Sequence, residues 1–321
     1  MSDRINLSIV VPVYNVEQFL ETCIDSLLAS RGIEAAEIIL VDDGSTDDSS
    51  AIVDRLSDEH DNIFSYHIEK SGPSIARNFG LNKARGKYVF FCDSDDMVVS
   101  EIFSQVINMT RECDSDILLW DAILVDGNGN KSDRKDCDYY IHRGLDTSGG
   151  VITGKDAVEQ QLISRGDYPA TVWLGVFKCS FLSEYGLSFK EGILHEDELW
   201  AQEVLLCARS VQYIPEIIYL YRIHDGSITN PVVKDWTKHI ESLLYVYPAL
   251  FAFSDEHLTE GPLKRMFDAA IAHRYLYMIY KYDFYKYGYG KAIDIGSLWK
   301  KSTSLKAKLK IVLLWIKGIW Y

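Results

Sequence analysis

Two acidic clusters, each directly after an apolar run, could bind a metal ion or a nucleotide. Asp93-Ser94-Asp95 places two carboxylates one residue apart, and such hard oxygen ligands bind Mg²⁺ or Mn²⁺ together with substrate phosphates. Asp42-Asp43-Gly44-Ser45 could hold the base or the ribose of a nucleotide. Both patterns also occur in plain turns and at helix N-caps, where aspartate bonds the backbone.

Two later segments add carboxylates and hydrogen-bond donors. His195-Glu196-Asp197-Glu198 is a dense acidic cluster at the start of a helical pattern, and it could also simply complement the positive end of the helix dipole. Tyr221 to Ser227 offers an arginine, a histidine and a hydroxyl group that could contact a diphosphate or a metal ion. In a loop, such side chains are also often only solvated.

Several common catalytic motifs are excluded. The glycines and the lysine of residues 149–155 have phosphate-loop spacing, but Asp156 stands where a Mg²⁺-binding hydroxyl is needed. The sequence has no G-x-G-x-x-G after the first apolar run, no H-E-x-x-H and no G-x-S-x-G. Dehydrogenase, zinc protease and serine hydrolase functions therefore lose their main support.

The elements that must position these clusters alternate between strands and helices. The apolar runs predict strands over residues 7–13, 37–41 and 87–92, with another over 66–68. Helical spacing predicts helices over 17–29, 49–59 and 75–83. This alternation predicts an α/β protein with a mainly parallel sheet, whose ligands lie beyond the carboxyl ends of the strands.

The rest of the chain has a different character. Residues 126–138 are polar and predict a hairpin or a flexible loop, and a helical, aromatic-rich pattern begins near Pro231. We therefore expect one domain over 1–230 and a helical region over 231–321. From Ile295 on there are six lysines and no acidic residue. Leu305, Leu309, Val312, Ile316 and Trp320 form one helical stripe there.

That basic segment, over residues 300–321, predicts a helix lying on an anionic membrane surface. The alternatives are a terminal helix packed on the protein's own acidic body and a contact between two copies of the chain, so a homo-oligomer stays open. The apolar run of residues 311–316 is too short to span a bilayer.

Composition bounds the partners and the compartment. The 321 residues carry a formal net charge of −14, which argues against nucleic acid as a partner. The six cysteines form no C-x-x-C pair and are expected to be reduced and mostly buried. Without a signal-peptide pattern or 18 consecutive apolar residues, we expect a cytoplasmic protein, and the basic segment leaves peripheral binding to the inner face of the membrane as an open alternative.

Taken in chain order, the motifs closely resemble those of glycosyltransferase family 2. The resemblance covers roughly residues 5–230. It rests on Val11 to Asn15, Val41 to Asp47, Gly72 to Gly80, Phe91 to Asp96, His195 to Glu198, and Tyr221-Arg222 with Gly226-Ser227-Ile228. It implies a Rossmann-like GT-A fold, here with a helical C-terminal extension, a nucleotide-diphospho-sugar donor, Mn²⁺ or Mg²⁺, and inversion at the anomeric carbon.

The resemblance also implies roles for individual residues. Asp95 would bind the metal ion, Asp93 would face the ribose or a metal-bound water, and His224 is the candidate late metal ligand. Asp197 would be the general base, while Glu196 would orient it or act as the base itself. The donor would contact the following residues: Pro12, Tyr14, Asp42, Asp43, Arg77, Asn78, Ser94, Arg222 and Ser227.

The hypothesis from the sequence is a metal-dependent inverting glycosyltransferase of bacterial surface polysaccharide assembly. It would transfer a hexose or N-acetylhexosamine, most simply from a UDP-sugar, to a saccharide or a polyprenyl-diphosphate-linked saccharide. One alternative is a sugar nucleotidyltransferase, which also pairs a nucleotide with a D-x-D metal site. The other is a non-catalytic carbohydrate- or nucleotide-binding protein with a degenerate site.

Overall fold

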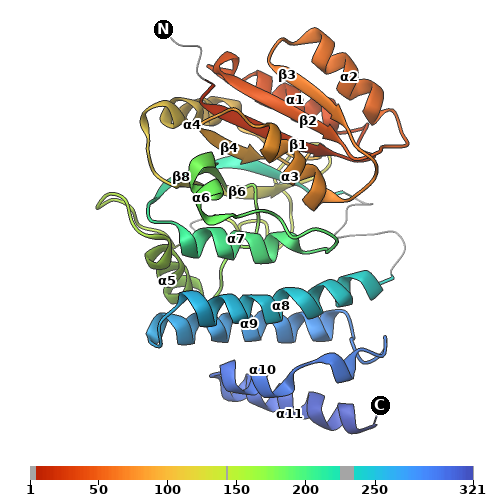
Figure 1. Cartoon of the computed structure of the whole chain (residues 1–321), viewed down its shortest axis with the longest axis vertical. Coiled ribbons are helices and arrows are strands. Elements are labelled where there is room, and N and C mark those ends of the chain that lie inside the picture. Colours follow the sequence, from red (N-terminus) through yellow and green to blue (C-terminus); the bar gives the residue numbers. More distant parts are fainter. Residues whose placement is uncertain (1–4, 142–143, 225–234, 321) are drawn as a thin grey trace.

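The computed structural model describes residues 5–141, 144–224 and 235–320 (Figure 1). Within these residues the chain forms one mixed sheet of eight strands in the order β3-β2-β1-β4-β7-β6-β8-β5. The strands are β1 (Leu7–Val13), β2 (Ala36–Asp42), β3 (Ile63–His67), β4 (Tyr88–Phe91), β5 (Met97–Val98), β6 (Ile117–Val125), β7 (Gly175–Lys178) and β8 (Val211–Arg222).

Helices cover the sheet and then continue beyond it. Those of the first half are α1 (Leu20–Leu28), α2 (Ser49–Glu59), α3 (Pro73–Lys83) and α4 (Ser100–Glu112). Those of the second half are α5 (Gly154–Arg165), α6 (Cys179–Tyr185), α7 (Glu196–Cys207), α8 (Thr237–His257), α9 (Pro262–Lys281), α10 (Ile295–Lys301) and α11 (Leu305–Trp320).

The N-terminal half follows the sequence pattern closely. β1 pairs in parallel with β2 and β4, and β2 pairs in parallel with β3. β1 and α2 have the predicted bounds, whereas β3 begins at Ile63 instead of Tyr66. The difference arises because Ile63 is buried opposite Ile38, so β3 pairs with β2 several residues earlier than its aromatic residues suggest.

The second half of the sheet adds antiparallel pairing. β7 lies between β4 and β6 and is antiparallel to both, while β8 is parallel to β6. The α/β class and the helical C-terminal region are confirmed, but the sheet is mixed. Residues 126–130 form a tight turn in which Asp126 Oδ1 accepts hydrogen bonds from the backbone N–H groups of Asn128 and Asn130.

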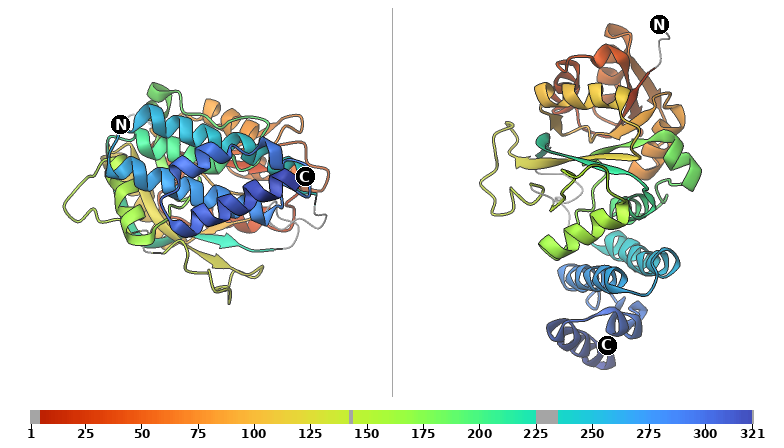
Figure 2. Two further views of the ribbon diagram at one scale, coloured as in Figure 1. Left: turned by 90° about the horizontal axis from the view of Figure 1, so that it is seen from below. Right: turned by 90° about the vertical axis from the view of Figure 1, so that its left-hand side faces the viewer.

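The C-terminal helices are stacked away from the sheet, with α8 and α9 as one layer and α10 and α11 as the next (Figures 1 and 2). Part of the aromatic-rich sequence forms the contact between α8 and α9, where Tyr247 and Tyr275 are stacked with ring centroids 4.7 Å apart. In the described part of the chain, no helix is both long and apolar enough to cross a bilayer.

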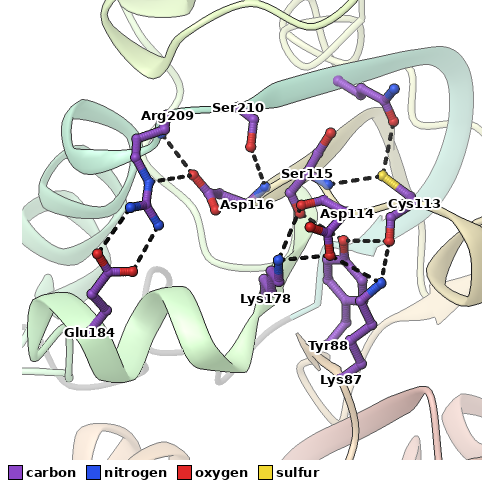
Figure 3. Close-up of polar contacts among 11 residues, drawn as sticks. Lys87, Tyr88, Cys113, Asp114, Ser115, Asp116, Lys178, Glu184, Arg209 and Ser210 are labelled. Carbon is purple, nitrogen blue, oxygen red and sulfur yellow. Dashed lines mark hydrogen bonds and ion pairs between the residues drawn. The ribbon is translucent and has the colours of Figure 1, made fainter.

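A polar network ties the other edge of the sheet together, at the amino ends of β4 and β6 (Figure 3). Lys87 and Lys178 both pair with the exposed Asp114, at 3.4 Å and 2.8 Å. The buried Tyr88 hydroxyl donates to the Ser115 carbonyl at 2.7 Å. Because the clusters singled out in the sequence follow the carboxyl ends of strands, this network lies at the opposite edge from them.

Gly80 sets the distance between α3 and β1. A Cβ atom at this position would lie 2.3 Å from Val10 Cγ1, which is far closer than two carbon atoms can approach. The absence of a side chain therefore allows α3 to lie directly on the sheet. This explains a glycine in the middle of a helix, where it otherwise costs stability.

We predict that Gly80→Ala lowers the free energy of unfolding by about 1–3 kcal/mol, because the added methyl group overpacks the contact with Val10. The control is Gly296→Ala in α10, where a new Cβ meets no atom closer than 3.4 Å. That variant should be neutral or up to about 1 kcal/mol more stable. Urea unfolding tests both, and equal effects of the two variants would contradict this account.

Candidate functional site

The candidate site lies where the carboxyl ends of β1, β2, β4 and β8 meet. β1, β2 and β4 are parallel, and β8 has the same direction because β7 is antiparallel to both β4 and β6. This edge therefore collects Tyr14, Asp42, the Asp93-Ser94-Asp95 segment and Arg222. Pro12 lies within β1 opposite Val41, just before the same edge. Ser94 is buried.

Arg77 connects the acidic cluster after β4 with the acidic cluster at the start of α7. Its Nη2 donates to Asp93 Oδ1 at 2.8 Å, and its Nη1 donates to Glu196 Oε1 at 2.5 Å. Arg77 and Glu196 are both buried, with side chains 8% exposed. Burial opposes the charge on Arg77, but the two carboxylates outweigh it and raise the pKa of the guanidinium. Arg77 thus joins the end of β4 to the first turn of α7.

Asp95 and His224 form the second pair of the site. His224 Nε2 lies 2.8 Å from Asp95 Oδ2, and both side chains remain partly accessible. The carboxylate oxygen is a ligand that suits Mg²⁺ or Mn²⁺, and the imidazole nitrogen is a common second ligand for divalent transition metals. The described residues contain no group of three or more histidine, cysteine, aspartate or glutamate side chains arranged as a metal site. Any ion here would depend on substrate oxygens for its remaining ligands, as Mg²⁺ sites commonly do.

Asp96 is the residue that brings His224 to Asp95, and sequence reasoning gave it no role. Its Oδ2 accepts a hydrogen bond from the Tyr219 hydroxyl and its Oδ1 accepts one from the Arg222 backbone N–H, both at 2.7 Å. Asp96 therefore fixes the end of β8 against the segment that follows β4. Its position directly after a D-x-D pattern was the only signal in the sequence.

Arg222 and Phe19 extend this part of the site. The Arg222 guanidinium lies 4.9 Å from the centre of the Phe19 ring, and the His224 ring centroid is 4.4 Å from the same ring. Arg222 is buried, and its Nε has no hydrogen-bond partner within residues 5–141, 144–224 and 235–320. Phe19 was missed because it reads as an ordinary apolar position of the first helix. Ser227 lies outside the described residues.

The expected nucleotide-binding carboxylates Asp42 and Asp43 are both buried, but they are held differently. Burial raises the pKa of Asp42, yet hydrogen bonds from Ser45 and His67 outweigh it and lower the pKa overall. Both oxygens of Asp43 accept backbone N–H groups, from Ser71 at 2.6 Å and from Gly72 at 2.8 Å. Asp43 thus fixes the start of α3.

Tyr14 and Asn78, which were also predicted to contact the donor, have partners within the protein. The Tyr14 ring lies 3.8 Å from Lys70 Nζ. Asn78 donates through Nδ2 to the Phe189 carbonyl and accepts from the Phe189 N–H through Oδ1, both at 2.9 Å. Asn78 therefore holds the chain that leads toward α7, and its amide group is already occupied.

Asp197 stands at the start of α7 with a partly exposed side chain. Its Oδ1 accepts a hydrogen bond from the Glu198 backbone N–H at 2.9 Å. Burial and the neighbouring charges of Glu196 and Glu198 raise the pKa of Asp197 well above its usual range, and Arg77 only partly opposes them. A partly exposed carboxylate with a raised pKa, next to the polar groups of the site, is suited to accept a proton.

A partly buried arginine contacts the other side of this helix turn. Arg274 on α9 donates to Glu198, to Asp167 Oδ1 at 3.0 Å and to the Tyr168 carbonyl at 2.8 Å. Glu198 is consequently committed to α9, whereas Glu196 is committed to Arg77. Among the described residues, Asp197 is the one of these three consecutive acids that forms an ion pair with neither Arg77 nor Arg274.

Comparison with known sequences identifies the family. The model of "Glycosyl transferase family 2" matches residues 8–152. EpsJ, an uncharacterized glycosyltransferase of Bacillus subtilis strain 168, is 30% identical over 276 residues, which are 85% of this chain and 76% of EpsJ. The chain therefore belongs to glycosyl transferase family 2. YibD, an uncharacterized glycosyltransferase of Escherichia coli K12, is 30% identical over 72% of this chain, which spans 65% of YibD.

A solved structure shares the fold. The structure of S. aureus TarS residues 1–349 in complex with UDP matches with a TM-score of 0.69 and 19% identity, over 98% of this chain and 88% of that one. The same fragment in complex with UDP-GlcNAc matches with a TM-score of 0.67 and 20% identity. This likeness confirms the expected GT-A fold.

His195, directly before Glu196, is held in an unusual way. Its backbone is left-handed, with φ of 61°, and its Nε2 lies 3.0 Å from His239 Nδ1. Burial, together with the nearby positive charges of His239 and Lys281, lowers the pKa of His195 to about 3. The folded protein thus keeps this imidazole neutral, whereas the unfolded chain protonates it with an ordinary pKa near 6.5.

We predict that His195 contributes a loss of stability as the pH falls from 7 to 5, because the unfolded state binds a proton that His195 does not bind in the folded state. Glu203, whose pKa burial raises to about 7, acts in the opposite direction, so the contribution of His195 is read from the difference between the variant and the wild type. The loss from His195 is about 2 kcal/mol, at about 1.4 kcal/mol per pH unit below 6.5. His195→Asn, which tolerates the left-handed backbone, should reduce the loss, and replacement of the exposed His273 by Asn should not. Urea unfolding at both pH values tests this, and an undiminished loss in His195→Asn would refute it.

Proposed function

We propose that the protein is a metal-dependent inverting glycosyltransferase that transfers a hexose or N-acetylhexosamine from a UDP-sugar. The observation that carries the proposal is the double ion pair of Arg77, which joins Asp93 of the D-x-D segment to Glu196, the neighbour of Asp197. This double ion pair supports the proposal because it holds Asp93 close to the neighbour of Asp197, although the two are far apart in the sequence.

The donor site is assigned to the edge formed by β1, β2, β4 and β8. UDP as the nucleotide is supported by the shared fold with TarS, which was solved with UDP and with UDP-GlcNAc. Tyr14 and Asp42 would contact the base and ribose. Arg222 is suited to the diphosphate because its buried Nε lacks a partner among the described residues, and a guanidinium matches phosphate oxygens.

Asp95 and His224 would hold the divalent cation, with Asp93 beside them. A bound Mg²⁺ or Mn²⁺ supplies positive charge next to the diphosphate oxygens on which negative charge develops. Arg77 keeps Asp93 oriented, and Asp96 keeps His224 within reach of Asp95. These two positioning contacts preorganise the site, so that the side chains need not rearrange during transfer.

Asp197 would act as the base on the acceptor side. Its carboxylate takes the proton of the acceptor hydroxyl while that oxygen forms a bond to the anomeric carbon. The bond between the anomeric carbon and the diphosphate oxygen breaks, and UDP leaves with the electron pair. Glu196 already shares Arg77 and therefore orients this turn of α7. Attack opposite the leaving group inverts the configuration. The acceptor is proposed to be a saccharide or lipid-linked saccharide of surface polysaccharide synthesis.

The first test measures sugar transfer and UDP release from a panel of UDP-sugars with Mn²⁺ or Mg²⁺. Asp197→Asn should lower kcat by about 10²–10⁴-fold, the usual contribution of a general base, and Asp95→Asn should abolish cation-dependent turnover. Glu203→Gln on the same helix is the matched control and should stay active.

The products separate the alternatives. A parallel assay supplies UTP and a sugar 1-phosphate in place of the UDP-sugar, and formation of a UDP-sugar with release of pyrophosphate would instead identify a sugar nucleotidyltransferase. Binding of a UDP-sugar without turnover under all these conditions would favour a non-catalytic binding protein. Near-normal turnover in Asp197→Asn would disprove the assigned base.

The raised pKa of Asp197 gives a second prediction. The base must be deprotonated, so kcat/KM should fall as the pH falls through a pKa above the usual carboxylate range. Glu198→Gln removes one of the charges that raise this pKa, and it should therefore move the acidic limb to lower pH, while Glu203→Gln should leave it in place. A limb that stays unmoved in Glu198→Gln would contradict the electrostatic origin.

A further inference from the structure

α10 and α11 form the end of the molecule that is furthest from β1, β2 and β3 (Figure 1). Seen from below, they are the nearest elements in the left view of Figure 2. α11 is attached by one face, on which Ala307, Ile311 and Leu314 are buried. The buried Tyr285 hydroxyl also donates to the Leu314 carbonyl at 2.6 Å.

The opposite face of α11 is apolar as well, and it is exposed. At 100° per residue, the residues at 305, 309, 312, 313 and 316 fall within about 100° of the helix circumference, and the buried residues lie on the other side. We call these five residues the apolar stripe, and their exposed fractions are Leu305 84%, Leu309 61%, Val312 36%, Leu313 54% and Ile316 43%. Trp315, 58% exposed, lies beside the stripe.

Lysines border the apolar stripe. The same helical spacing places Lys306, Lys310 and Lys317 along one side and Lys308 along the other. From Ile295 to the last residue the sequence contains no acidic side chain, although the whole chain has a net charge of −14. Positive charge is thus concentrated around the one helix of this end that presents a continuous apolar face to solvent.

This arrangement decides between the three surfaces that could cover the apolar stripe: the protein's own body, a second copy of the chain and a membrane. The protein's own acidic body cannot cover the apolar stripe, because the stripe points away from the face that packs on the body. A second copy related by a two-fold axis would bring the same lysine-bordered stripe against itself, and like charges would meet. A partner that carries negative charge at its surface and an apolar layer beneath that charge would match both the bordering lysines and the apolar stripe.

We propose that α11 docks on the surface of a bilayer that contains anionic phospholipids. The apolar stripe would enter the boundary between headgroups and acyl chains, Trp315 would lie at headgroup level, and the bordering lysines would contact lipid phosphates. The helix lies flat in this arrangement and does not span the bilayer. Docking is a property of α11 and needs neither donor nor cation.

The test is co-sedimentation of the full chain, without nucleotide sugar, with vesicles of phosphatidylcholine containing 30% phosphatidylglycerol. Lys306→Gln with Lys310→Gln should lower the partition coefficient about 30-fold, at about fivefold per lysine. Leu309→Ser with Ile316→Ser should lower it at least about tenfold. Leu309 and Ile316 lie on the outer side of α11, and the two lysines lie beside the stripe, where Lys310 Nζ is 5.7 Å from the centre of the Tyr280 ring. Thermal unfolding of each variant is measured alongside, and it should stay close to that of the wild type.

Matched controls use exposed residues elsewhere in the chain. Val151→Ser with Ile163→Ser removes apolar side chains that are 51% and 70% exposed, and Lys135→Gln with Lys155→Gln removes two exposed lysines. Both controls should bind vesicles like the wild type. The proposal is overturned by no binding, by equal binding to pure phosphatidylcholine, by equal losses in the controls, or by a dimer in sedimentation velocity that Leu309→Ser with Ile316→Ser dissociates.

Discussion

The site depends on the two ion pairs that the Arg77 guanidinium forms. A buried charge is tolerated only when it is paired, and Arg77 is paired twice, with Asp93 after β4 and with Glu196 at the start of α7. Loss of either carboxylate would leave charge unbalanced in a dry environment. The pairing explains why two motifs that are separated in the sequence by β5, β6 and β7 lie together in one site. The ion pairs that make the buried Arg77 tolerable in the folded protein are therefore also the contacts that bring the two motifs of the site together.

Asp96 provides a second, smaller constraint of the same kind. Burial and the charges of Asp95 and Asp93 raise the pKa of Asp96 well above its usual range. Its two oxygens nevertheless accept hydrogen bonds from Tyr219 and from the Arg222 backbone, so the end of β8 is fixed. The four residues from Asp93 to Asp96 thus alternate in direction. Asp93 and Asp95 face Arg77 and His224, and Asp96 faces the core.

The sequence predicted the parts that follow from periodicity and motif. The buried strands β1, β2 and β4 are continuous apolar runs. Asp95 and His224, which the family resemblance implied as metal ligands, lie next to each other, and their role as ligands stays a prediction. The antiparallel insertion of β7 could not be predicted, because four residues carry too little pattern and their partners are distant. Nor could the commitment of Asp43 and Asn78 to backbone groups, since a polar side chain in a motif looks the same whether it binds ligand or loop.

The position of β7 has a consequence for how the chain folds during synthesis. β1 can pair with one side of β4 once residue 91 has left the ribosome, but the other side of β4 is covered only by Gly175–Lys178. A fully apolar strand, Tyr88–Phe91, is therefore an open edge while the whole intervening segment is translated. Open apolar edges attract other chains. The nascent protein is thus most exposed to misassembly over that interval, and β7 closes it.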